Sequence, residues 1–254
     1  MNTVKAVFDY TFREHVRHKV WLSAALFGLI LIAGGLVASA LAQDERARML
    51  LDLGLAANEA IAMISVVFLT VHLILQEVES RAIFLILTHP VRRWHYLLGR
   101  FLGTLAAVGL GLAAMGLFHW LILFALGWTG EGSYLLAWSC SLGKTAVMGA
   151  LALLLSLALT SEAAAMAFSV FFWILGHFSS EMNYIAEKSG SSFMRAAILA
   201  FSRAAPDFAH LNYRDAAAAG LPGHRWMAAA LLYVVGYCAA CLALSVQIFE
   251  QKEF

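Results

Sequence analysis

The sequence predicts an all-α protein that crosses the membrane several times and forms a single transmembrane domain over residues 1–254. Hydrophobic residues make up 62% of the chain and charged residues 13%, and the mean hydropathy is +0.78. Soluble domains are about a quarter charged. Long uncharged runs also approach the roughly 20 residues that a membrane-spanning helix needs. Because lipid offers no partners to backbone groups, such runs form helices.

The first 19 residues predict an amphipathic helix in the membrane interface. Apolar side chains recur at every fourth position, and a mostly basic row runs beside them. The apolar row is Val4, Phe8, Phe12 and Val16, and the polar row is Lys5, Asp9, Arg13 and Arg17. A basic amphipathic helix lies beside anionic headgroups. An ordinary extension of the first span is the alternative.

Six apolar runs follow, and we expect six membrane-spanning helices. Their approximate bounds are residues 20–42, 58–76, 101–127, 135–160, 163–179 and 226–249. The second run is the weakest, because its apolar core at 61–75 is short for a span. Only Ser161 and Glu162 separate the fourth and fifth runs, which predicts a tight turn between them.

The distribution of lysine and arginine favours cytoplasmic termini in a bacterial inner membrane. Four basic residues precede position 20, and four more lie between 76 and 100. With six spans these segments and the C-terminus share one side, and short cytoplasmic loops are enriched in lysine and arginine. The facing loops hold Arg46 and Arg48 and no basic residue in 127–132.

The loop at 76–103, "QEVESRAIFLILTHPVRRWHYLLGRFLG", concentrates charge between two apolar spans. Helical spacing continues through Glu77, Glu79 and Arg81, and a short apolar run follows. Pro90 then breaks the helix, and Trp94 begins the re-entry as an interfacial anchor. The pattern predicts a short helix on the cytoplasmic face that docks a soluble partner. A loop held by its positive charges is the alternative.

This loop resembles the first cytoplasmic loop of ABC-2-type transporter permeases. The family pattern is E-x-x-x-R, a short apolar helix, a proline turn with arginine after it, and a run like "LLGRFLG". These elements correspond to Glu77 with Arg81, then 82–87, 88–93 and 97–103. The segment "APDFAHLNYRDAAAAGLPGHRW" and the ending "IFEQKEF" are similar to the same class. Within it, the chain looks most like the branch associated with maturation of copper enzymes such as nitrous-oxide reductase.

The resemblance implies the transmembrane permease subunit of an ATP-driven ABC exporter, which works as a dimer on separate cytoplasmic ATPase subunits. The chain is then a transport subunit with no catalytic residue and no cofactor of its own, and ATP and Mg bind the partner ATPase. The chain also lacks a G-x-x-x-x-G-K-[ST] phosphate loop. Coupling-helix residues expected to contact the ATPase are Glu77, Glu79, Arg81, Ile83, Phe84, Leu87, His89, Pro90, Arg92 and Arg93.

Polar residues inside the spans are candidates for function, because lipid makes them costly. They are His72, His119, Lys144, Glu162 and His177. Lys144 can extend toward the outer end of its span. His72 and His177 lie near opposite ends of their spans, so we expect no shared metal site. Histidines near span ends are more often interface residues than ligands.

The segment at 180–225 is the main external feature. Phe193, Met194, Ile198 and Phe201 form an apolar stripe that predicts an amphipathic helix ending before Pro206. Such a helix can lie on the outer leaflet, gate the exit of a lipid-like substrate, cap the bundle or dock a periplasmic partner. The sequence leaves these uses open.

Other function classes remain open beside the exporter. One is a membrane scaffold or mechanotransmitter that uses ATPase strokes without moving a substrate. Another is an ATP-independent channel or secondary transporter. Nucleic acid is not an expected partner, since the net charge is only +1. A membrane-embedded enzyme is disfavoured, because no spaced acid, base or metal-ligand set falls on neighbouring helix faces.

Overall fold

The computed structural model describes residues 3–18, 20–41, 46–80, 92–189, 191–213 and 223–251, and this part of the chain is helical. The long helices are α2 (Val20–Leu41), α3 (Arg46–Glu79), α5 (Arg93–Ala125), α6 (Glu131–Ala158) and α10 (His224–Gln251). The shorter ones are α1 (Thr3–His18), α7 (Glu162–His177), α8 (Ser179–Lys188), α9 (Ser192–Ala204) and the 3-10 turn η1 (Ala209–Leu211).

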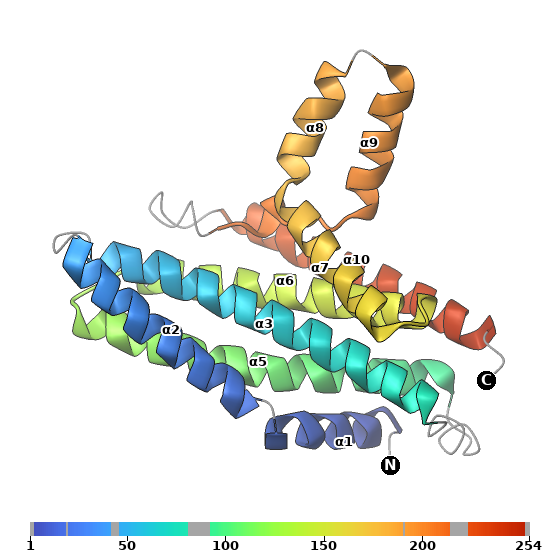
Figure 1. The fold of residues 1–254 in the computed structure, drawn as a ribbon, viewed down its shortest axis with the longest axis horizontal. Coiled ribbons are helices and arrows are strands. Elements are labelled where there is room, and N and C mark those ends of the chain that lie inside the picture. Colours follow the sequence, from blue (N-terminus) through green and yellow to red (C-terminus); the bar gives the residue numbers. More distant parts are fainter. Residues whose placement is uncertain are drawn as a thin grey trace.

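The bundle is built around α3, α5 and α6, which run side by side along the long axis (Figure 1). Their facing sides are apolar and fully buried, as at Val67, Leu112 and Val147. Helix α2 crosses α3 and α5, α10 packs on α6, and α1 lies along the first turns of α5. Close van der Waals packing of these apolar faces holds the helices together, because lipid is as apolar as the faces themselves.

Four helices in the described part of the chain are long and apolar enough to cross a membrane. They are Ala47–Glu79, Arg93–Ala125, Gly132–Ala158 and His224–Gln251. Helices α7 and α8 meet at a bend of 73° and together would make a fifth. The chain is therefore a multi-pass membrane protein, and the expected count of six spans stays a prediction.

Helix α3 is much longer than the span expected at 58–76, because it begins at Arg46. The added turns carry the charged residues Arg46, Arg48 and Asp52, and Asn58 and Glu59 follow at the start of the expected span. The structure buries both: Asn58 is 1% exposed and the side chain of Glu59 14%. A span that faces other helices can carry such groups, so hydropathy alone places its start too late.

Helices α8 and α9 form a hairpin that projects sideways from the layer of long helices (Figure 1). Helix α9 ends at Ala204, before Pro206, as expected. The chain then returns across the end of α7, where Phe208 is fully buried. A Cβ on Gly176 would lie 2.6 Å from both Phe208 Cδ2 and the carbonyl oxygen of Pro206. The return therefore requires glycine at that position.

Candidate functional site

The expected coupling-helix residues fall partly outside the described residues. Residues 81–91 lie there, and with them Arg81, Ile83, Phe84, Leu87, His89 and Pro90. The flanks are described: α3 ends at Glu79, which is exposed, and α5 begins at Arg93, just after the exposed Arg92. The docking helix stays a prediction, and the structure shows what holds the end of α3 before it and the start of α5 after it.

Arg100 is the centre of a charged cluster that joins α1, α3 and α5. Its side chain is only 4% exposed and forms an ion pair with Glu77. It also donates to the hydroxyl of Thr11 at 2.9 Å and lies 3.6 Å from the carboxylate of Glu14. The hydroxyl of Tyr96 donates to the same Glu77 carboxylate. We call these residues of the three helices the Arg100 cluster.

The Arg100 cluster includes Glu77, one of the residues expected to contact an ATPase. Its carboxylate is 16% exposed and bonded to Arg100 and Tyr96, and its contact with an ATPase stays a prediction. Aromatic rings also flank the guanidinium: the ring centroids of Tyr10 and Tyr96 lie 5.1 and 5.5 Å from its carbon. A buried, multiply bonded charge such as this one fixes the relative position of helices.

A second arginine joins the start of α5 to the end of α10. Arg93 donates to the carbonyl oxygens of Phe249 and Glu250, the latter at 3.1 Å, and lies over the ring of Phe249 at 5.6 Å. The last carbonyls of a helix have no partners within it and attract cations. Arg93 therefore caps α10 from the end of the expected docking segment.

Two glycines let α1 approach α5 closely. A Cβ on Gly99 would lie 2.7 Å from Val7 Cβ, and one on Gly103 would lie 2.7 Å from Thr11 Cβ. Two glycines four residues apart in the sequence indicate that another helix packs closely against them. In the structure that helix is α1.

The intramembrane candidates are bonded in three separate groups. His72 of α3 bonds Glu162 at the first residue of α7, at 2.9 Å. His119 of α5 is fully buried between the Tyr134 hydroxyl at 3.1 Å and the Leu50 carbonyl at 3.0 Å. His72 and His119 thus have structural partners on neighbouring helices.

The third group joins α3, α6 and α7 through Glu59, which the sequence analysis missed. Lys144 Nζ donates to the two carboxylate oxygens of Glu59 at 2.9 and 3.0 Å, and His177 Nε2 lies 3.1 Å from Oε1. Lys144 is 4% exposed, so its ammonium stays between helices rather than at the outer end of its span. A lysine in an apolar run requires a partner, and that requirement was the available signal for Glu59.

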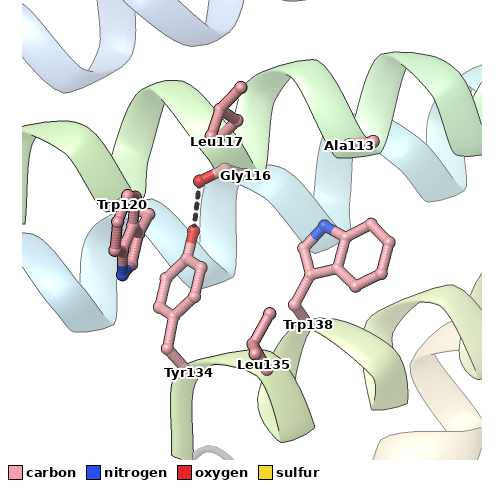
Figure 2. Close-up of a pocket in the computed structure, with 7 residues that line it drawn as sticks. All are labelled: Ala113, Gly116, Leu117, Trp120, Tyr134, Leu135 and Trp138. Carbon is pink, nitrogen blue, oxygen red and sulfur yellow. Dashed lines mark hydrogen bonds between the residues drawn. The ribbon is translucent and has the colours of Figure 1, made fainter. Parts of the chain in front are cut away.

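An apolar cavity of about 330 Å³ lies between α5 and α6, and Figure 2 shows residues that line it. The Tyr134 hydroxyl in its wall donates to the carbonyl of Gly116 at 2.7 Å, and Trp138 Nε1 donates to that of Leu112 at 3.1 Å. Because these polar groups are already bonded, the cavity suits an apolar group such as an acyl chain.

A comparison with known families agrees with this architecture. The family model described as ABC-2 family transporter protein matches residues 55–254, from the middle of α3 to the C-terminus. The matched range includes the expected docking segment, the long helices α5, α6 and α10, and the α8–α9 hairpin. No curated protein matches the chain. The resemblance seen in the loop at 76–103 is confirmed, and the chain belongs to the ABC-2 family of transporter proteins.

Proposed function

We propose that the chain is the permease subunit of an ATP-driven exporter, working as a dimer with each subunit docked on a separate cytoplasmic ATPase. Its family supplies the class: a membrane component of a transporter. ATP hydrolysis then takes place on the partner chain, with its Mg, and the docking segment at 77–98 passes the ATPase motion into the membrane.

The observation that carries this proposal is the attachment of the two ends of the docking segment. On the α3 side Glu77 bonds Arg100 and Tyr96, and Arg100 bonds Thr11 of α1. On the α5 side Arg93 bonds the end of α10. A displacement of residues 80–92 therefore acts on four helices at once through charged, directional contacts.

The proposed topology has six spans and both termini in the cytoplasm of a bacterial inner membrane. Four long helices, the apolar helix α7, and α2, with 22 residues of mostly apolar sequence, support the count. Helix α1 lies in the cytoplasmic interface beside lipid headgroups, with its basic residue Arg13 exposed. The α8–α9 hairpin then lies on the outer side, where it can contact lipid or a periplasmic partner.

Co-purification and ATP hydrolysis test the proposal together. The wild-type chain should purify with a Walker-motif ATPase whose hydrolysis rises when substrate is added. The double variant E79A/R81A should keep the fold and lose this stimulation, because its docking contacts are gone. The matched control E187A/K188A removes an exposed acid and an exposed base on α8 and should leave the stimulation unchanged.

The outcomes separate the function classes. Absence of any ATPase from the purified complex contradicts an ATP-driven exporter and favours a channel or secondary transporter. If an ATPase docks and its hydrolysis changes in E79A/R81A, but no substrate is moved, the chain is a mechanotransmitter. Unchanged stimulation in E79A/R81A contradicts the placement of the docking site.

A further inference from the structure

Helix α7 ends level with the middle of α6. Its residue Gly176 lies against Phe208, because a Cβ on the glycine would be 2.6 Å from the ring. The amide of Leu211 bonds the carbonyl of Phe208 at 3.0 Å, and its Cδ2 would be 3.8 Å from a Cβ on Gly143. Gly143 is near the midpoint of α6 (Glu131–Ala158). The break between α7 and α8 therefore lies about halfway along the bundle.

This level falls inside the part of the bundle that the membrane surrounds. Leu142, next to Gly143, has its Cδ1 3.6 Å from a Cβ built on Gly109, the central residue of α5. Exposed apolar side chains run along α5 from Leu102 to Phe124, about 33 Å at the helical rise, which matches the roughly 30 Å hydrocarbon core. The α8–α9 hairpin projects sideways at this depth (Figure 1).

The hairpin does not suit a surrounding of lipid alone. Helix α8 exposes Glu187 and Lys188 at its end, and α9 exposes Arg195 near its start. Charged side chains at membrane depth are costly, and they face protein or a water-filled cavity instead. Helix α8 has 10 residues and is about 15 Å long, so the tip of the hairpin lies beyond the cover of its own bundle.

The tip also carries a large apolar surface. Phe193 and Met194 are 85% and 56% exposed. Water alone would leave this surface uncovered, whereas lipid alone would surround the charges beside it. Apolar side chains rimmed by polar and charged ones are the pattern of a contact between proteins.

A matching surface lies at the base of the same hairpin. A cavity of about 390 Å³ opens there between α3 and α7. The small side chains of Ala56 and Ala60 leave room on α3, and Ile174 and Phe178, 45% and 53% exposed, form the wall on the side of α7. This opening suits an aromatic side chain, but the tip of the same copy points away from it (Figure 1).

The two ends of the hairpin are opposite in net charge. The tip, residues 187–195, contains one acid and two bases, which are Glu187, Lys188 and Arg195. The base, residues 179–183 and 202–207, contains two acids and one base, which are Glu181, Asp207 and Arg203. A tip therefore complements the base of another copy, whereas two tips repel each other.

We propose that a second copy of the chain covers this surface, with the tip of each hairpin packed at the base of the other. A twofold axis beside the middle of the hairpin produces this arrangement, because it exchanges tip and base. Phe193 of each copy then enters the cavity between α3 and α7 of the other. This inference rests on the dimer of the proposed function and names the surface through which it forms.

Photo-crosslinking from the tip tests the contact in the membrane. The full chain carries benzoylphenylalanine at residue 193 or, as the matched control, at residue 121 of α5, on the side of the bundle away from the hairpin (Figure 1). Leu121 is 50% exposed, so both positions are open in a single copy. Residue 193 should give an adduct of two copies, linked within 56–60 or 174–178, and residue 121 should give none.

Self-association of the purified protein in detergent provides a second readout. F193A should weaken the dimer about tenfold, the size expected for the loss of an aromatic anchor at an interface. L121A is the matched control and should leave the dimer unchanged. Because Phe193 is 85% exposed in one copy, F193A should keep the fold.

The outcomes separate this surface from the dimer itself. A chain that is dimeric by mass, but whose residue 193 links only to lipid, to another protein or to nothing, would overturn the surface and leave the proposed dimer standing. Equal self-association of wild type and F193A would overturn the surface as well. A chain that is monomeric in the membrane would contradict both the surface and the proposed dimer.

Discussion

Lys144 shows what a single residue in the sequence can and cannot predict. A lysine in a long apolar run requires a partner, and the structure supplies Glu59 at 2.9 Å. The partner could not be chosen from sequence, because the sequence does not show which helix lies beside Lys144. The same holds for Arg100, whose position in a basic loop suggested an orientation signal rather than a buried ion pair.

The buried pair predicts a non-additive response to mutation. K144M should destabilise the protein by about 3 kcal/mol, because it leaves Glu59 charged between helices with His177 as its remaining partner. The double variant E59Q/K144M should recover at least half of that loss, since Glu59 no longer places a negative charge between the helices. Thermal midpoints of the purified protein in detergent measure both.

An exposed pair provides the control for this comparison. His72 and Glu162 have side chains 45% and 42% exposed. E162Q should therefore change stability by less than about 1 kcal/mol. A double variant E59Q/K144M that is no more stable than K144M would contradict the buried-pair account.

At the scale of elements, α1 is attached to α5 by geometry as well as by charge. The spacing of Gly99 and Gly103 in the sequence indicates that some helix packs closely against α5. It does not show that this helix is α1, because the two glycines would admit any helix. Likewise the amphipathic pattern of residues 3–18 predicts an interfacial helix without showing that Thr11 bonds Arg100.

Adding a methyl group at this contact should loosen α1. In G103A the new Cβ meets Thr11 Cβ and the Phe8 carbonyl oxygen at 2.7 and 3.0 Å, so the helices must separate. We expect a loss of about 1–3 kcal/mol, the usual cost of overpacking, and faster proteolysis within residues 3–18. In G109A the nearest atom is Leu142 Cδ1 at 3.6 Å, an ordinary contact. Equal effects of G103A and G109A would contradict close packing of α1.

For the whole molecule, the sequence predicted the helical class, the order of the apolar helices and the end of α9 before Pro206. It did not predict that α3 extends from Arg46 to Glu79, or that α7 and α8 bend by 73°. These features depend on which helices lie beside each other, which local hydropathy does not encode. The docking helix lies outside the described residues, so it still depends on the sequence pattern and the family.

Cysteine labelling in intact cells tests the proposed topology. Thr129, in the turn between α5 and α6, should lie outside, and Glu79 should lie in the cytoplasm; both are exposed. A membrane-impermeant maleimide should therefore label T129C in intact cells and E79C only after lysis. The native cysteines are buried and contribute little background. Labelling of E79C in intact cells would contradict the orientation.

The central claim is that a separate ATPase docks at the end of α3. The most direct measurement places a photoreactive benzoylphenylalanine at residue 79 and identifies its covalent adduct in cells, with residue 129 as the control. The account predicts an adduct with a Walker-motif ATPase from residue 79 and none from residue 129. The absence of an ATPase adduct at residue 79, or equal yields at the two positions, would contradict it.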